Sequence, residues 1–471
     1  MLRRCLRLQR CEKPPLKFNI QTSNQQYTDR QNPTRLSQRR PISSLWILVV
    51  LCACCMPLLF LHRRGIQSQQ QEKEMAVRSE AFFLSIDNQS KNKSAEQFDR
   101  LAGTLGFPPD ANKSDFPVVV DLKAAEVYYE IEPQLNNLLS KQLGRENQPI
   151  PPIPQRLKTY LSEARPQLSL IQSHLLTQTQ PQWETNTALM VSSDYPSAGL
   201  TNIYNTQKLL LLSAIAHAAN NQEKEAIDAL EASWQLNQAI AHRPDLTSKI
   251  LQSTIADYQN RLLRHLSLPH LSLARWQHRL ASQNQHAITE GIRFDAWLQY
   301  ETLQRSLSTL TASLDYLASL SPVHHFKLTN IDVAQTTHRA VDRLTSANIC
   351  EISPIALEAE LTKVETANWN DKGIPTPSTL VKRWKTEGDR TLSQELTNHT
   401  LALKKHYQTY QQWPTATKTS SIECPEEYWL YKPESDGSIS IEFSAKLEDN
   451  KLETSAIYPL RMSLAAPMRN R

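Results

Sequence analysis

Apolar residues recur along most of the chain at the three- and four-residue spacing of a helix face. The clearest series consists of Tyr300, Leu303, Leu307, Leu310, Leu314 and Leu317. Its intervals alternate between three and four, which predicts one long helix over 294–318 with an apolar stripe. We expect this stripe to pack within the chain, because it is shorter than the repeat of a sustained coiled coil.

Similar patterns predict further helices on both sides of this segment. Val127, Ile131, Leu135 and Leu139 are spaced by four, as on one face of a helix over 122–145. Further helices are expected over 157–175 with an interruption at Pro166, over 329–348, over 354–367, and from a capping box at Thr391 and Gln394.

The pattern changes near the C-terminus. Ile439, Ile441 and Phe443 alternate with other residues, and Asp436-Gly437 precedes them. An Asp-Gly pair favours the positive φ of a tight hairpin turn. We therefore expect a β-hairpin within the segment 422–471, packed on the helices because an isolated hairpin is marginally stable in water.

Two apolar helical patterns meet at Asn220-Asn221. The stretch that follows this turn reads NNQEKEAIDALEASW and carries small residues such as Ala226 and Ser233. Over 207–240 it resembles one degenerate tetratricopeptide repeat, a family of helical hairpins that bind proteins. No second unit follows at the repeat spacing, so a generic helical hairpin is the alternative. The wider stretch 157–268 is similar to helical regions of exported bacterial proteins of unknown activity.

Glycine usage supports a mainly α fold. The chain has nine glycines in 471 residues, and they are scattered. A phosphate-binding loop needs clustered glycines so that backbone N–H groups can approach an anion. A nucleotide-binding domain and an all-β domain with many glycine turns are therefore not expected. We predict helical hairpins, in a body that is solenoid-like at most in part.

One apolar run is long enough to cross a membrane. Residues 42–61 contain no charged side chain, and twenty helical residues match the ~30 Å hydrocarbon core of a bilayer. Arg39-Arg40 and Arg63-Arg64 flank the run. We predict a single transmembrane helix over 42–61, preceded by a basic head (1–41) and followed by a stalk or spacer (62–115) and a helical-hairpin domain (116–412).

Charge is concentrated before this run. Residues 1–41 carry ten basic and two acidic residues, a net +8, which leaves −3 for the rest of a chain whose total is +5. The basic head favours a cytoplasmic N-terminus with the body outside the cell membrane, although the close flanks are equally basic. We expect the head to contact anionic lipid. The near-neutral body is not expected to bind nucleic acid.

Cysteines divide in the same way. Cys350 and Cys424 are the only two after the apolar run, and in an exported body they are candidates for one disulfide. Two separate buried thiols are the alternative. Leu51–Cys54 loosely resembles a bacterial lipobox with Cys54 as the lipidated residue, but the apolar run continues beyond it, which favours a membrane helix.

Catalytic and metal-binding motifs are missing from the sequence. Beyond the apolar run it has no HExxH or CxxC, and the adjacent pair His324-His325 lacks a third ligand nearby. Glu358 with Glu360, and Asp295 with Glu301, are the candidate acid–base pairs. We therefore expect no metal or cofactor and a membrane-anchored extracytoplasmic scaffold or protein-binding module. An envelope-associated hydrolase on a helical fold is the alternative, and the partner is not identified by the sequence.

Overall fold

The structure is a computed structural model. It describes residues 70–108, 119–145, 148, 150–191, 199–268, 271–281, 286–311, 322–363, 376–415, 417–444 and 461–464, with side chains omitted between 306 and 333. The predicted head, the apolar run 42–61 and Cys54 lie outside these residues and stay predictions. Across the described ranges, no helix combines the length and the apolar character that a membrane span requires.

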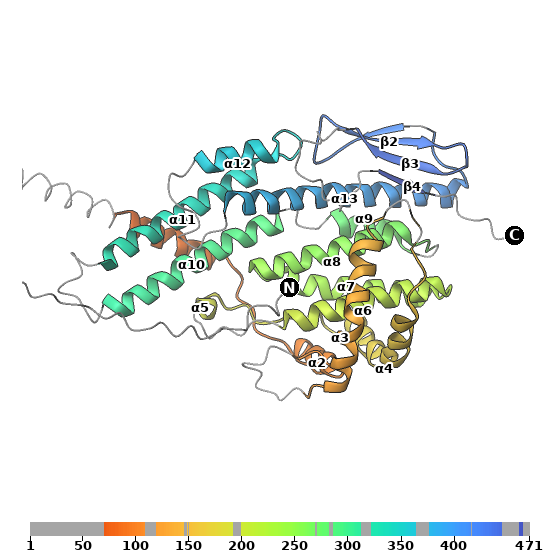
Figure 1. Ribbon diagram of the computed structural model, residues 1–471, viewed down its shortest axis with the longest axis horizontal. Coiled ribbons are helices and arrows are strands. Elements are labelled where there is room, and N and C mark those ends of the chain that lie inside the picture. The colour runs from red at the N-terminus through yellow and green to blue at the C-terminus, as the bar shows by residue number, and fades with distance from the viewer. Residues whose placement is uncertain are drawn as a thin grey trace, which may run out of the picture. The chain divides into compact units, whose positions relative to one another are not determined.

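The described chain is mainly helical, as the sequence predicted, and ends in a small antiparallel sheet of four strands where a single hairpin was predicted (Figure 1). A helix over 70–84 comes first. The other helices are α2 (Lys93–Gly103), α3 (Leu122–Asn137) continuing as the π-helix η1 (Leu138–Gln142), α4 (Gln155–Thr177), α5 (Thr187–Met190), α6 (Leu200–Ala219), α7 (Glu223–Ala241), α8 (Leu246–His265), α9 (Leu273–Ala281), α10 (Ala287–Thr311), α11 (Pro322–Ser346), α12 (Pro354–Lys363) and α13 (Pro377–Tyr410).

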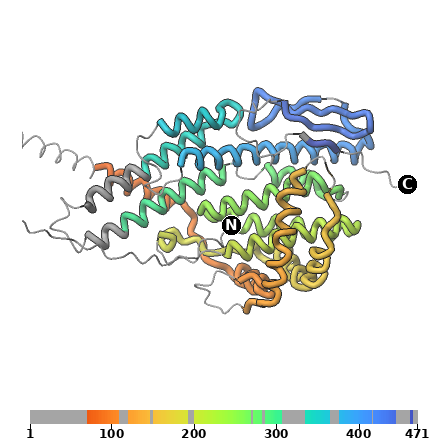
Figure 2. The backbone as a smooth tube through the Cα atoms, viewed as in Figure 1, coloured from red at the N-terminus to blue at the C-terminus, as the bar shows by residue number. Residues whose placement is uncertain are grey.

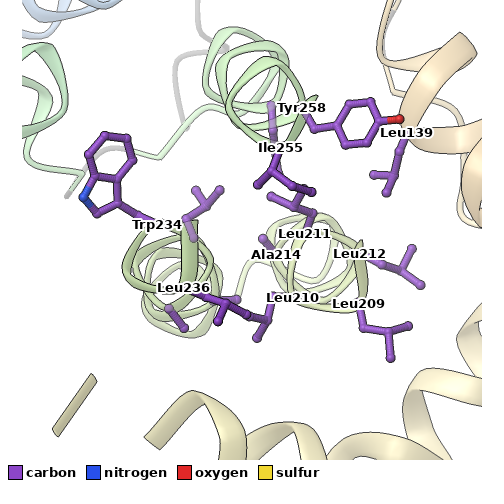
Figure 3. Packing of buried hydrophobic residues seen from close by; sticks show 14 of the residues in the cluster. Leu139, Leu209, Leu210, Leu211, Leu212, Ala214, Trp234, Leu236, Ile255 and Tyr258 are labelled. Carbon is purple, nitrogen blue, oxygen red and sulfur yellow. The ribbon is translucent and has the colours of Figure 1, made fainter. Parts of the chain in front are cut away.

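Helix α6 lies inside the larger hydrophobic core. The four consecutive leucines Leu209–Leu212 are all fully buried, so this helix is covered on every side. Figure 3 shows Leu211 pointing toward Ile255 of α8, while Leu210 points to the side from which Leu236 of α7 projects. Helices α6, α7 and α8 therefore form the centre around which α2, α3, α4 and α9 are arranged.

The turn between α6 and α7 follows the Schellman pattern of a helix end. The N–H of Gln222 donates to the carbonyl of His217 at 2.9 Å, and the N–H of Asn221 donates to the carbonyl of Ala218 at 3.1 Å. Asn221 has the positive φ of 57° that this motif requires. The hairpin predicted around Asn220-Asn221 is confirmed, whereas the tetratricopeptide resemblance stays a prediction.

The second core joins α13 to the sheet. The strands β1 (Thr417–Ser420), β2 (Tyr428–Pro433), β3 (Ile439–Phe443) and β4 (Arg461–Leu464) pair as an antiparallel meander in chain order. Trp429 and Ile441 of the sheet share this core with Leu396 of α13. In Figure 2, α13 runs between the sheet and α8, and it contacts both. The predicted hairpin is confirmed as β2–β3, with Gly437 at φ 82° in its turn.

Part of the stretch predicted as a stalk or spacer (62–115) packs on other helices. Phe82 and Phe83 of the first helix pack on Phe294 of α10, with ring centroids 6.4 and 5.9 Å apart. Phe98 of α2 is fully buried in the larger core. The sequence did not predict this packing. Polar residues surround these rings, and a helix with only two or three buried side chains shows little periodicity.

Two predicted helix boundaries are wrong. Helix α4 continues through Pro166, and both Pro166 and Ser162, whose carbonyl loses its helical partner, are exposed residues. Thr391 lies in the middle of α13 rather than at a helix start, and its hydroxyl donates to the carbonyl of Glu387 at 3.1 Å. The real cap of α13 is Thr376, whose side chain accepts from the N–H of Thr379.

Candidate functional site

A groove of about 870 Å³ lies beside α4. Its walls are one side of α4, the extended segment 150–153, the end of α6 with its turn (215–222), and residues 265–267 after α8. We call it the α4 groove. Helix α4 contributes Lys158, Leu161, Ser162, Arg165, Leu168 and Ser169.

Local sequence explains each wall of the α4 groove. The α4 residues are three, four or seven positions apart, so they lie on one side of the helix. Pro151-Pro152 holds the facing segment extended, because proline fixes φ and cannot donate a backbone hydrogen bond. Helix α8 ends near the residue that follows η1, where the His265 Nε2 lies 3.1 Å from the carbonyl of Leu143.

The charged side chains of the α4 groove are basic. Lys158 and Arg165 are exposed, and neither forms a hydrogen bond or ion pair with its side chain in the described part of the chain. His217 lines the opposite wall, with its Nδ1 2.7 Å from the Gln222 Oε1. Among the described residues that line the groove there is no aspartate or glutamate. The surface therefore favours a ligand with negative charge.

The helix ends at the groove do not cancel this charge. A helix C-terminus carries about half a negative charge on its free carbonyls. At the end of α8, the Lys404 Nζ donates to the carbonyls of Leu263, Arg264 and Leu266 at 3.0, 2.7 and 2.7 Å. At the end of α6, the Schellman bonds occupy the carbonyls. Lys158 and Arg165 therefore set the potential of the α4 groove.

A second groove, of about 700 Å³, lies on the other side of α4 against α2. In its wall the Ser94 Oγ lies 3.0 Å from the His174 Nε2. A serine nucleophile must direct its proton at the imidazole. The Ser94 hydroxyl instead donates to the carbonyl of Thr179 at 2.5 Å, and the imidazole also contacts the Ser94 carbonyl. The pair fastens α2 to the end of α4 and is not arranged as a catalytic dyad.

Three of the four carboxylates proposed as acid–base pairs have other partners in the structure. Glu301 accepts from the Ser79 hydroxyl at 2.6 Å, and Asp295 accepts from the Leu246 N–H at 3.3 Å. Glu360 is paired with Arg343 at 2.7 Å. The side chains of the candidate pair His324-His325 lie outside the description. Where side chains are described, no three histidine, cysteine, aspartate or glutamate residues form a metal-binding group.

Cys350 and Cys424 lie together as a disulfide, with Cα atoms 5.7 Å apart. Cys350 follows α11, and Cys424 lies between β1 and β2. The bond therefore ties the helical part of the second core to the sheet. It belongs to the structural framework, because the α4 groove is lined by other elements.

Asp295 is expected to make the stability of the protein depend on pH. Burial raises its pKa from 3.8 to about 6, against the opposing hydrogen bond from Leu246. The folded state thus binds this proton more tightly than the unfolded state, so stability falls as the pH rises from about 4 to 6. We expect Asp295→Asn to raise the free energy of unfolding at pH 7.5 by about 1 kcal/mol, given its partial exposure. Urea unfolding at pH 4 and 7.5 tests this, and an equal gain at both pH values contradicts it.

The sequence did not indicate the α4 groove, although the seven-residue spacing of Lys158 and Arg165 was visible in it. Two of the facing walls come from segments more than forty positions further along the chain, and nothing in the sequence connects them to α4. No family model, curated protein or solved structure matches this chain.

Proposed function

We propose that this chain is a membrane-anchored extracytoplasmic module that binds a segment of a partner protein in the α4 groove. The observation that carries the proposal is the groove itself, whose volume of about 870 Å³ lies in the range of ligand sites. The predicted membrane helix at 42–61 supplies the anchor. Helical hairpins such as α6–α7 present side chains of several helices to one ligand, which is how helical repeat proteins bind peptides.

The lining of the α4 groove fits a peptide better than other ligands. The partly exposed Leu161 offers apolar contact beside Ser162 and Ser169, which offer hydrogen bonds. The described lining contains no tryptophan, tyrosine or phenylalanine. Sugars and nucleic-acid bases are commonly held by stacking on such rings. A protein segment with alternating apolar and polar side chains needs no ring.

The hydrolase alternative receives less support. Its best candidate in the described residues is Ser94 with His174, and the Ser94 proton is directed at the carbonyl of Thr179. We therefore place the binding function first.

A steric block of the α4 groove tests the proposed function. Ser162 and Ser169 are exposed on the groove side of α4, so Ser162→Trp and Ser169→Trp fill the groove without disturbing the core. Peptides selected from a random phage-displayed library on the full chain in lipid nanodiscs are the probes. We expect each substitution to weaken the binding of the selected peptides at least about tenfold, because tryptophan occupies the contact volume.

Thr159→Trp is the matched control. Thr159 is exposed on the same helix but does not line the groove, and its hydroxyl bonds only to the Gln155 carbonyl. Binding should be unchanged in this variant. If selected peptides bind equally well to the Ser162→Trp, Ser169→Trp and Thr159→Trp variants, the α4 groove is not the peptide site.

A further inference from the structure

We infer that the partner segment bound in the α4 groove is an acidic amphipathic helix, with carboxylates opposite Lys158 and Arg165. The inference rests on the proposed function, because it assumes that the groove binds a protein segment. It goes further by assigning the chemistry of that segment.

The spacing of groups on α4 defines a pattern for the ligand. Lys158 and Arg165 are seven residues apart, as are Leu161 and Leu168. Seven helical residues span about 10.5 Å along the axis. The groove side of α4 thus presents cations two turns apart, with the partly exposed Leu161 between them and Leu168 buried beneath. A helical ligand with acids at positions i and i+7 and apolar residues between them matches both.

The excess of basic groups is a property of the α4 groove and not of the chain beyond residue 41. Beyond residue 41 the chain has a net charge of −3. The described lining nevertheless contains Lys158, Arg165, His217 and His265 and no carboxylate. Lys158 and Arg165 have no ion-pair partner in the described residues, so an incoming carboxylate does not have to displace one. Such complementarity speeds association and selects the partner.

Other anions fit this arrangement poorly. A single phosphate meets both cations only when their long side chains bend toward each other across about 10.5 Å of helix, and it leaves Leu161 without a contact. A nucleic acid strand would need stacking partners for its bases, and the described lining offers no aromatic ring. The adjoining Leu161 favours a ligand that also has apolar side chains, as an amphipathic protein segment has.

Two synthetic peptides of sixteen residues test the inference. The first has glutamate and leucine at the spacing described above, and the second has glutamine in place of every glutamate. Binding to the full chain in phosphatidylcholine nanodiscs is measured by fluorescence anisotropy, with empty nanodiscs as the blank. We expect the glutamate peptide to bind at least about tenfold more tightly, and its advantage to shrink as the salt concentration is raised.

Charge-reversal variants of α4 provide the second test of the inference. We expect Lys158→Glu with Arg165→Glu to weaken the glutamate peptide at least about tenfold and to leave the glutamine peptide within about twofold. Lys123→Glu with Lys382→Glu is the control, since both lysines are exposed, lie outside the lining and give the same change in net charge. This control should not alter the binding of either peptide.

The outcomes separate this inference from the proposed function. Equal binding of the two peptides, lost in the Ser162→Trp variant, would overturn the acidic ligand and retain the peptide groove. Binding of the glutamate peptide that responds equally to both charge-reversal variants would show attraction to net charge alone and would also overturn the inference. Insensitivity of all peptide binding to Ser162→Trp would reject the proposed function itself.

Discussion

Replacing Glu395 by alanine is expected to lower the free energy of unfolding by about 4 kcal/mol. Glu395 lies on α13 and is buried, with 5% of its surface exposed. Its carboxylate accepts four hydrogen bonds, from the Ser421 hydroxyl at 2.7 Å, the Trp429 Nε1 at 2.9 Å, and the N–H groups of Ile422 and Glu423 at 2.9 and 2.7 Å. Alanine leaves all four donors without this acceptor.

These four bonds connect the sheet to the helix beneath it. Ser421 follows β1 and Trp429 belongs to β2, so one carboxylate positions the loop and the first hairpin of the sheet on α13. A hydrogen bond to a charged acceptor contributes about 1.5–3 kcal/mol, and four that share one acceptor are not additive. The loss should therefore be large but below the simple sum.

Urea unfolding of the full chain, followed by circular dichroism, measures the effect. Glu395→Gln keeps one acceptor oxygen and places an amide NH₂ against donors, so we expect a loss of about 2 kcal/mol. Glu163→Gln, an exposed position on α4, should change stability by less than about 0.5 kcal/mol. A loss below about 1 kcal/mol for Glu395→Ala would mean that the donors find other acceptors and that Glu395 does not hold the sheet.

The sheet also shows what the sequence could and could not predict. The β2–β3 hairpin was predictable because Ile439, Ile441 and Phe443 alternate and Gly437 supplies the turn. Strand β1 (Thr417–Ser420) was not, since all four of its residues are exposed and its sequence has no apolar residue. An edge strand of this kind is recognised only through its pairing with β2.

Buried charged residues were harder to predict from the sequence than strand β1. A prediction from hydrophobic periodicity assigns every lysine, arginine and glutamate to the surface. Lys208 and Arg264 are nevertheless almost fully buried, and the Arg264 guanidinium donates to the Ser393 and Thr397 hydroxyls of α13 at 3.1 and 2.6 Å. Such groups fix which helices neighbour each other, but their partners lie more than seventy positions away in sequence. The helices were therefore more predictable than their packing.

Lys208→Met is the second substitution with a large expected effect. The Lys208 side chain is fully buried on α6, and its Nζ lies 2.9 Å from the Glu132 Oε1 and 3.1 Å from the Asn136 Oδ1 of α3. It also lies 4.5 Å from the ring centroid of Tyr204. Breaking a buried ion pair by removing one partner costs about 3–5 kcal/mol. Because the Glu132 side chain is 31% exposed, we expect a loss of about 3 kcal/mol.

The double variant Lys208→Met with Glu132→Gln separates the ion pair from the packing. If the loss comes from the uncompensated Glu132 carboxylate, removing that charge should restore about half of it. Lys224→Met, an exposed position on α7, is the control and should have little effect. A double variant no more stable than Lys208→Met would place the loss in packing against Tyr204 instead.

The pH dependence of the free energy of unfolding tests the role of Lys208 independently. Burial lowers the pKa of Lys208 below its ordinary 10.5, and Glu132 opposes the shift by its hydrogen bond and its charge. The unfolded state then binds this proton more tightly than the folded state, so the free energy of unfolding rises with pH between the folded pKa and 10.5. Methionine cannot titrate, and the stability gap between wild type and Lys208→Met should widen over that interval. A gap that narrows instead would mean that the ion pair outweighs burial and holds Lys208 charged in the core.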